Sequence, residues 1–321
     1  MLGRYQVRVK NNRNSYSFEL KRNITILRGQ SGRGKTTLFE MVREYNRYGK
    51  GSGVTISCDK EIVALDGGNW KEIIEGSKQT IFIIDEDSEF IRSRDFAVTL
   101  RSSDNYFLLI TRNYLNELPI SVDEIYEITG NKNKKFKKLY QEIYKMYDHP
   151  SMRSLPFKPD VIITEDSGAG YQFFKNRAEK AGVKCISAFG KTKILNTLKQ
   201  FHDENVLIIA DGAAFGAEIG DIVEQQKMTP KKLALFLPES FEWIILSSGV
   251  VPGDKDKIER TYLYADSVSY MSWEQYYADL LVEYTRSPEY LIYRKERLSE
   301  YYLQDKNVEL ICSEIKGVKF D

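Results

Sequence analysis

Histidine and cysteine are scarce in this sequence of 321 residues, and their scarcity excludes several kinds of site. The only histidines are His149 and His202, so a histidine-based zinc site or a catalytic triad with a histidine base has almost nothing to draw on. The cysteines Cys58, Cys185 and Cys312 are widely spaced and form no Cys-x-x-Cys pair. They therefore favour reduced thiols over a disulfide framework.

Long apolar runs and a large net charge are also lacking. No run approaches the roughly 18 apolar residues of a membrane span, and the first residues do not read as a signal peptide. We therefore expect a cytoplasmic protein with no membrane partner. The formal net charge is +1, so no global basic field points to nucleic acid. With 42% hydrophobic and 29% charged residues, the composition is that of a globular protein, with length for about two domains.

The most specific motif of the chain is a glycine-rich stretch with the spacing G-x-x-x-x-G-K-T. An apolar run at 24–27 precedes it and predicts a buried strand, and the helical spacing of the residues after it predicts a helix. In that setting, backbone N–H groups converge on phosphate oxygens. The expected phosphate-binding residues are Gly29, Gln30, Ser31, Gly32, Arg33, Gly34, Lys35, Thr36 and Thr37.

This stretch resembles the Walker A loop of P-loop NTPases, and a second motif resembles Walker B. The apolar run 81–84 ends in Asp85 and Glu86, as a buried strand would at the ligand-binding edge of an α/β sheet. The resemblance implies ATP and Mg²⁺ as cofactors. We expect Lys35 to contact the β- and γ-phosphates, Thr36 and Asp85 to hold Mg²⁺, and Glu86 to orient or deprotonate the attacking water.

Other polar residues near these motifs have two readings each. Thr111 follows the apolar run 106–110 and resembles the sensor residue of P-loop ATPases, but it also fits an ordinary strand end. The neighbouring Arg112 is either a phosphate contact or solvated. Three arginines after the second motif fit either an arginine finger acting in trans or a solvated helix face, and these are Arg92, Arg94 and Arg101.

The rest of the first domain, expected at residues 1–150, contains two further patterns. Alternating polarity at 5–10 and 15–20 predicts a hairpin, which resembles the start of an ABC-type or related P-loop ATPase domain, although no ABC signature motif is found. Residues 131–147 combine a lysine cluster with apolar residues at helical spacing. We favour an amphipathic helix there, and the alternative is a contact with a nucleic-acid backbone.

The second half alternates strand-like and helix-like segments. Apolar runs near 161–164, 184–190, 206–210 and 233–237 are separated by helical patterns, which predicts βαβ units and a mostly parallel sheet. The expected fold class is therefore α/β, with an N-terminal P-loop NTPase sheet domain and a second parallel α/β domain at 151–250. A helical extension at 251–321 is expected to pack on the second domain, with helices at 273–284 and 291–302.

Residues 160–245 resemble a TOPRIM domain, as found in primases, topoisomerases and overcoming-lysogenisation-defect (OLD) nucleases. The resemblance rests on Glu165 and Asp211 at strand ends, on Gly190, and on the stretch 237–242 after the fourth strand. It implies that Glu165 and Asp211 bind Mg²⁺, with Glu165 acting in catalysis at a phosphodiester.

Two acidic positions of that family's pattern are alanines in this chain, at Ala213 and Ala169. Other acidic residues are available as substitutes, namely Asp166, Glu218, Asp221, Glu239 and Glu242. Two functions remain open. The first is an ATPase that controls a TOPRIM-like, Mg²⁺-dependent nuclease acting on DNA or RNA. The alternative is a nucleotide-dependent regulatory module with a non-catalytic second domain, and either would work as a homo-oligomer or with a protein partner.

Overall fold

The chain folds as an α/β protein with parallel sheets, divided into two units. The computed structural model describes residues 1–29, 32–113, 115–131, 139–147, 157–230, 232–315 and 318. Contacts group Met1–His149 with Thr261–Met271 as the first unit, and Pro150–Arg260 with Ser272–Asp321 as the second. The segment 251–321, expected to pack on the second domain as one extension, is therefore split between the units.

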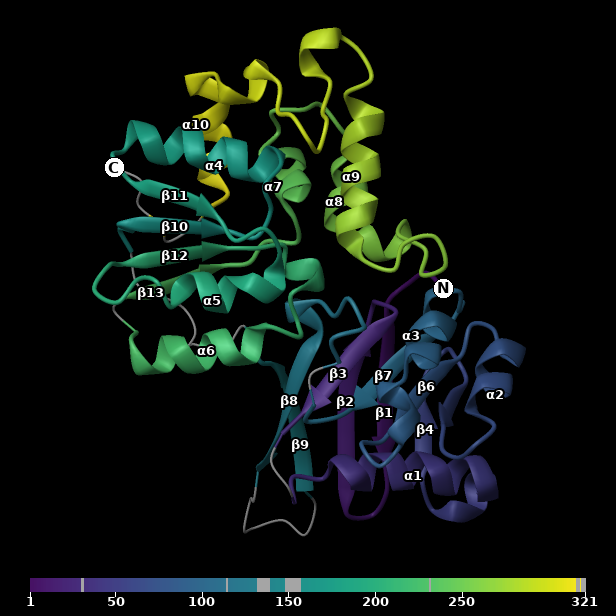
Figure 1. The fold of residues 1–321 in the computed structure, drawn as a ribbon. Coiled ribbons are helices and arrows are strands. Elements are labelled where there is room, and N and C mark those ends of the chain that lie inside the picture. Colours follow the sequence, from purple (N-terminus) through teal and green to yellow (C-terminus); the bar gives the residue numbers. More distant parts are fainter. Residues whose placement is uncertain are drawn as a thin grey trace. The chain divides into compact units, whose positions relative to one another are not determined.

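The first unit is built on a nine-stranded sheet within the described residues (Figure 1). In spatial order the strands are β4 (Thr55–Ser57), β1 (Tyr5–Lys10), β2 (Asn14–Leu20), β9 (Leu139–Lys145), β8 (Ile125–Asn131), β3 (Ile24–Arg28), β7 (Tyr106–Ile110), β6 (Ile81–Ile84) and β5 (Ile62–Ala64). The expected hairpin is present as the antiparallel pair of β1 and β2.

The five strands from β8 to β5 run parallel to one another. Strands β3, β6 and β7 are buried at every position, as is typical of strands covered on both faces. Strand β7 lies between β3 and β6. The glycine-rich loop after β3 and the acidic pair after β6 therefore follow two strands with β7 between them. All three strands end at the same edge of the sheet.

Helices of the first unit cover both faces of this sheet (Figure 1). Leu38 and Val42 of α1 (Lys35–Tyr48) join the core on the face that carries Leu108 and Ile110 of β7. Phe96 of α3 (Arg94–Arg101) instead packs edge-on against Phe107, whose side chain points to the opposite face. The remaining helix is α2 (Trp70–Gly76).

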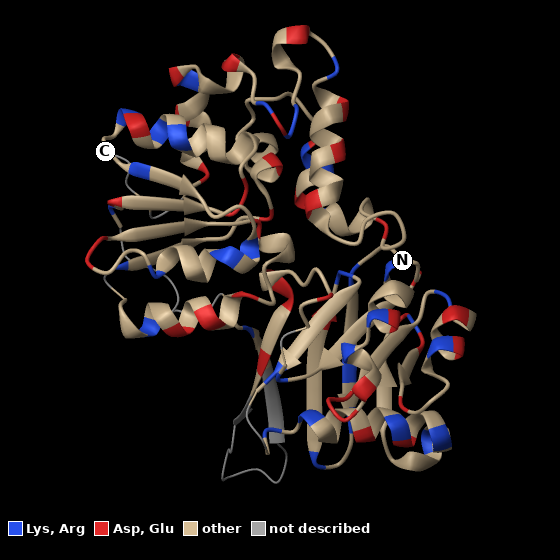
Figure 2. Cartoon of the chain, viewed as in Figure 1, with Lys and Arg blue, Asp and Glu red and all other residues tan. Residues whose placement is uncertain are grey.

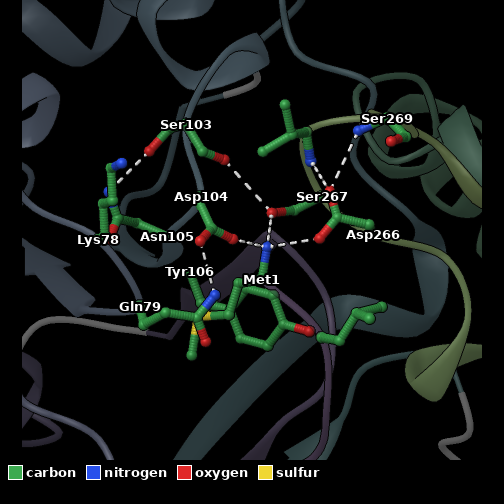
Figure 3. A network of polar contacts seen from close by, with 12 residues as sticks. Met1, Lys78, Gln79, Ser103, Asp104, Asn105, Tyr106, Asp266, Ser267 and Ser269 are labelled. Carbon is green, nitrogen blue, oxygen red and sulfur yellow. Dashed lines mark hydrogen bonds and ion pairs between the residues drawn. The ribbon is translucent and has the colours of Figure 1, made fainter.

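The segment 261–271 is joined to the first unit by polar contacts (Figure 3). The amino group of Met1 donates to Asp266 Oδ2 at 3.0 Å and to Ser267 Oγ at 2.6 Å, and it also pairs with Asp104. Asn23 Nδ2 donates to the carbonyl oxygen of Met271 at 3.1 Å. These bonds connect Met1 and Asn23, near the start of the chain, with a segment more than 200 residues away.

The second unit has a four-stranded parallel sheet in the order β11 (Lys184–Ser187), β10 (Val161–Thr164), β12 (Val206–Ile209) and β13 (Leu233–Phe236). Strands β10 and β12, in the middle, are fully buried. The helices are α4 (Ala169–Lys180), α5 (Ile194–Leu198), α6 (Ile219–Met228), α7 (Phe241–Ser247), α8 (Lys255–Glu259), α9 (Trp273–Tyr284) and α10 (Asp305–Ser313). The strand and helix alternation expected from the sequence is confirmed.

Two predicted helices were wrong. Residues 139–145 form strand β9, antiparallel to β8, and the lysine-rich stretch 132–138 lies outside the described residues. Residues 291–302 hold only the ends of two short 3₁₀ helices, Glu289–Leu291 and Glu300–Leu303. The helix predicted at 273–284 is confirmed as α9. In the described part of the chain, no helix combines the length and apolar character that crossing a membrane requires.

A buried ion pair supports the start of β3. Glu124 is completely buried, and its carboxylate lies 3.3 Å from Arg22 Nε and 3.7 Å from Lys21 Nζ. Burial raises the pKa of Glu124, and the charges of Arg22 and Lys21 act against that rise. The hydroxyl of Thr25, in β3, donates to the same carboxylate at 3.4 Å.

We expect Glu124→Ala to destabilise the first unit by about 3 kcal/mol or more, because the buried guanidinium of Arg22 loses this carboxylate. Asp123→Ala is the matched control. Asp123 pairs with Lys145 at 3.5 Å, but both side chains are partly exposed, so the cost should stay below about 1 kcal/mol. Urea unfolding with hydrogen exchange on β3 and β8 measures both, and equal effects would contradict the prediction.

Candidate functional site

Glycines shape the loop between β3 and α1. Gly29, Gly32 and Gly34 have φ values of 136°, 76° and 99°, in the region that disfavours side chains. At Gly29 a Cβ atom would also lie 3.1 Å from the Ile128 side chain. The loop therefore needs glycine for its course. It leads directly into α1, which has no acidic residue in its first turn, so the positive end of that helix is not neutralised locally.

Lys35, the first residue of α1, is bound to this loop by its side chain. Its side chain is 5% exposed, and its Nζ donates to the carbonyl oxygen of Gly29 at 2.6 Å. Burial lowers the pKa of Lys35, as does the charge of Arg112, whereas Glu86 and Asp85 raise it. The ammonium is therefore held at the loop, among charges from the neighbouring strand ends.

Asp85 and Thr36 meet at the start of α1. Asp85, directly after β6, is 5% exposed and accepts the backbone N–H of Glu86 at 2.8 Å. The Thr36 side chain hydrogen-bonds to the same carboxylate. Burial raises the pKa of Asp85, and these two hydrogen bonds partly offset the rise. One hydroxyl and one carboxylate side by side are oxygen donors of the kind that Mg²⁺ prefers, so these residues fit that ion.

Glu86 and Arg112 form an ion pair at the same edge. Their closest N–O distance is 3.2 Å, with Glu86 26% and Arg112 52% exposed. Thr111, at the end of β7, is completely buried and its Oγ1 accepts the N–H of Asn113 at 3.0 Å. The carboxylate of Glu86 is therefore accessible and positioned by a cation, while the Thr111 hydroxyl is engaged in its own turn.

No motif in the sequence marks the role of Tyr16. Its side chain, in β2, is completely buried, its hydroxyl donates to the carbonyl oxygen of Gly34 at 2.8 Å, and it also bonds to the Thr37 side chain. The alternation of the hairpin predicts that Tyr16 faces the core. It cannot predict that the hydroxyl holds the last glycine of the loop.

The remaining predicted residues of the first unit contribute less to this geometry. Gln30 and Ser31 lie outside the described residues. Arg33 is exposed beside the loop. The three arginines considered as a finger are exposed on the short 3₁₀ helix Glu89–Arg92 and on α3, and they are Arg92, Arg94 and Arg101.

In the second unit, Glu165 and Asp211 follow the adjacent strands β10 and β12. Glu165 Oε2 accepts the backbone N–H of Asp211 at 3.1 Å, and Asp211 Oδ1 accepts the N–H of Phe241 at 3.2 Å. A Cβ atom at Gly212 would lie 2.6 Å from the carbonyl oxygen of Leu237, so the backbones approach too closely for a side chain there. The structure thus brings the two predicted carboxylates together.

Both carboxylates are pushed towards their neutral forms. Burial raises the pKa of Glu165 to about 7; Glu274 and Glu218 add to the rise, while the Asp211 N–H and Lys191 oppose it. Burial also raises the pKa of Asp211, with Glu274, Glu242 and Glu165 adding to that rise. Carboxylates with these neighbours need a cation or protons to remain stable.

The candidate substitutes for the missing acids are placed differently from one another. Glu242 is 2% exposed and receives the Tyr293 hydroxyl at 2.7 Å on Oε1. Asp166 binds the N–H of Gly168 at 3.1 Å, and Glu218 lies 3.7 Å from Lys191 Nζ. Two others lie further out, with Asp221 exposed on α6 and Glu239 partly buried after β13.

Within the described residues, no group of three or more acidic, histidine or cysteine side chains is arranged to hold a metal ion. Glu165 and Asp211 each accept a backbone N–H with one carboxylate oxygen. A lysine also lies beside these acids, with Lys295 Nζ 2.6 Å from Glu274 Oε1. The residues at this sheet edge therefore do not match the metal ligands that the TOPRIM resemblance implies. Figure 2 shows acidic residues gathered where β10 and β12 end.

Sequence reasoning missed Glu274, Lys191 and Lys295 as part of this edge. Lys191 Nζ donates to the carbonyl oxygen of Ala214 at 2.7 Å. Glu274 and Lys295 lie 38 and 59 residues beyond the end of β13, the last strand of the sheet, and no motif marks them. No protein-family model matches this sequence, and no curated protein is significantly similar to it.

The second unit should lose stability as the pH rises through about 7. Glu165 has an ordinary pKa of 4.5 and a folded-state pKa of about 7. The folded form therefore holds a proton that the unfolded chain releases, and this contribution is complete below about pH 4.5 and disappears above about pH 7. Its upper limit is about 3 kcal/mol.

Glu165→Gln keeps the acceptor oxygen and removes the titration, so the decrease in melting temperature between about pH 5 and pH 8 should become smaller. Asp221→Asn, on the exposed face of α6, is the matched control and should leave the pH dependence unchanged. Fluorescence of Trp243 and Trp273 in a Trp70→Phe background reports on the second unit. A pH dependence that is identical in Glu165→Gln and the parent would contradict this assignment.

Proposed function

We propose that this chain binds and hydrolyses ATP with Mg²⁺ in its first unit, and that the nucleotide state controls the second unit. The observation that carries the proposal is the meeting of Lys35, Thr36, Asp85 and Glu86 at one edge of the sheet. They come from two separate motifs but surround the start of α1, where backbone N–H groups and the helix dipole attract phosphate.

The residues present fit the parts of such a site. The loop N–H groups and Lys35 would bind the polyphosphate, and in doing so Lys35 would exchange its bond to Gly29 for phosphate oxygens. Thr36 and Asp85 would hold Mg²⁺, which when bound neutralises charge on the phosphate oxygens. Tyr16 holds the carbonyl of Gly34 by its hydrogen bond.

Glu86 is the proposed catalytic carboxylate. It directly follows Asp85, and 26% exposure leaves its side chain open to solvent. A carboxylate in this position can orient a water molecule or accept its proton. The ion pair with Arg112 fixes its direction, and Arg112 lies close enough to Lys35 to act on the pKa of that ammonium. A second copy of the chain would be the source of any arginine acting in trans.

For the second unit, we propose a nucleic-acid-processing domain of the TOPRIM type, with DNA or RNA as partner. The alternative is a regulatory or binding domain that catalyses nothing. Two observations favour the alternative: the family's acidic positions are methyl groups at Ala169 and Ala213, and Lys295 lies among the acids that remain. Both candidates give the nucleotide-bound first unit the role of a switch in a cytoplasmic protein.

Lys35→Ala should weaken ATP binding at least about tenfold, because the variant loses a buried cation at the phosphates. Calorimetric titration of ATP in the presence of Mg²⁺ measures the affinity. Lys71→Ala, on the exposed surface of α2, removes the same charge elsewhere and should leave the affinity unchanged. An affinity for Lys35→Ala equal to that of the parent chain would refute the nucleotide assignment.

The two candidates for the second unit differ in what they predict for nucleic acid. If the unit only binds, the chain should retain DNA or RNA in the presence of a non-hydrolysable ATP analogue and leave supercoiled DNA and RNA intact with Mg²⁺ or Mn²⁺. Cleavage that disappears in Glu165→Ala but persists in Asp221→Ala would instead establish the nuclease. Gel assays with the same samples distinguish the two outcomes.

A further inference from the structure

Lys295 reaches the acidic edge of the second unit from a distant part of the chain. Its ammonium lies 2.6 Å from Glu274 Oε1, and its side chain is 50% exposed. Burial alone would lower the pKa of Lys295, but Glu274, Glu242 and Asp211 raise it well above its ordinary value. The lysine is thus a permanent positive charge that these carboxylates share.

The backbone around Lys295 is attached to the start of α4, and we call residues 295–298 the strap. The N–H of Ala169 donates to the carbonyl oxygen of Lys295 at 2.8 Å. The side chain of Gln172 donates to the carbonyl of Glu296 at 2.8 Å and accepts the N–H of Leu298 at 3.0 Å. Three hydrogen bonds therefore hold the strap beside the sheet edge.

The strap also explains why residue 168 is a glycine. A Cβ atom at Gly168 would lie 2.3 Å from the carbonyl oxygen of Lys295, closer than any side chain allows. Ala169 is completely buried next to it. An aspartate at 169, as the TOPRIM pattern has it, would bring a carboxylate into the place where the strap is bound.

The acidic edge holds more carboxyl groups than cations. Lys191 and Lys295 are the cations that act on its acids, and Lys191 is already bound to Glu218 and to the carbonyl of Ala214. The acids that act on one another electrostatically here are Glu165, Asp166, Asp211, Glu218, Glu242 and Glu274. This excess of carboxyl groups favours a cation at the edge, and Lys295 supplies one.

A small cavity and an unpaired carboxylate oxygen at this edge support a cation site. A cavity of about 20 Å³, the size of one water molecule, is lined by Glu165, Asp166 and Asp211 together with apolar residues such as Phe174 and Phe241. Glu242, 2% exposed, has a buried Oε2 with no hydrogen-bond partner among the described residues, and its charge acts on Asp211, Asp166 and Lys295.

We propose that Lys295 is a built-in counter-ion that closes this edge to divalent cations, and that removing its charge creates a binding site for Mg²⁺ or Mn²⁺ at Glu165 and Asp211. The ammonium supplies positive charge to the same carboxylates that a metal ion would need, and it repels a second cation. Because its side chain is half exposed, it can leave without unfolding of the core. Movement of the strap would then convert a closed edge into an open one.

This proposal is independent of nucleotide binding in the first unit. Its test uses the full chain without nucleotide, in an Asp85→Asn background that removes the metal contact of the first unit. Mn²⁺ is titrated, and the free ion is measured by electron paramagnetic resonance. The variants are Lys295→Met, which removes the charge, and Lys295→Arg, which keeps it.

Lys295→Met should bind one Mn²⁺ at least about tenfold more tightly than the background chain, and a further Glu165→Gln change should abolish that gain. Lys295→Arg should behave like the background. The proposal is overturned if folded Lys295→Met gains no Mn²⁺ affinity, or if Lys295→Arg gains as much.

Thermal melting checks that each variant is folded. If Lys295→Met does not fold, Lys295→Met combined with Glu274→Gln removes one charge of each sign and should restore folding. This double variant should still bind Mn²⁺ more tightly than the background chain. A folded double variant with no such gain would overturn the proposal, whatever the result of the ATP titrations.

Discussion

The burial of the Lys35 ammonium is the constraint on which the first unit depends. A cation that is 5% exposed must have partners, and the protein supplies one carbonyl oxygen, from Gly29, together with the nearby carboxylates of Asp85 and Glu86. Those partners come from β3 and β6, which are not adjacent, so β7 must separate them at the right distance. Fully buried apolar strands provide the rigidity that keeps these charged groups in register.

Much of this arrangement could be predicted because it is local. The glycine spacing, the apolar runs and the acids that follow them are contiguous in sequence, and parallel strands place their carboxyl ends at one edge. The order of the strands was not predictable, since it depends on pairings between distant segments. Strand β9 shows where prediction from the sequence fails. Leu139 and Ile143 are spaced as on a helix, yet their segment pairs with β8, and that partner is not visible in the segment itself.

The second unit shows the same limit in its chemistry. Glu165 and Asp211 were found because each ends an apolar run, and the structure brings them together. Lys295 was not found, because it belongs to no periodic pattern and reaches the edge only through the hydrogen bonds of the strap. Ala169 looked like the loss of a ligand in the sequence. In the structure its N–H donates to the carbonyl oxygen of Lys295, and the neighbouring Gly168 leaves no room for a side chain against the strap.

The two units therefore treat buried charge in opposite ways. In the first, a buried cation lies at a helix start without acidic residues in its first turn, with the carbonyl of Gly29 and the carboxylates of Asp85 and Glu86 near it. In the second, an excess of carboxylates is neutralised from within the chain by Lys295. Any cation from outside must displace this lysine, and any change that moves the strap alters the charge at Asp211.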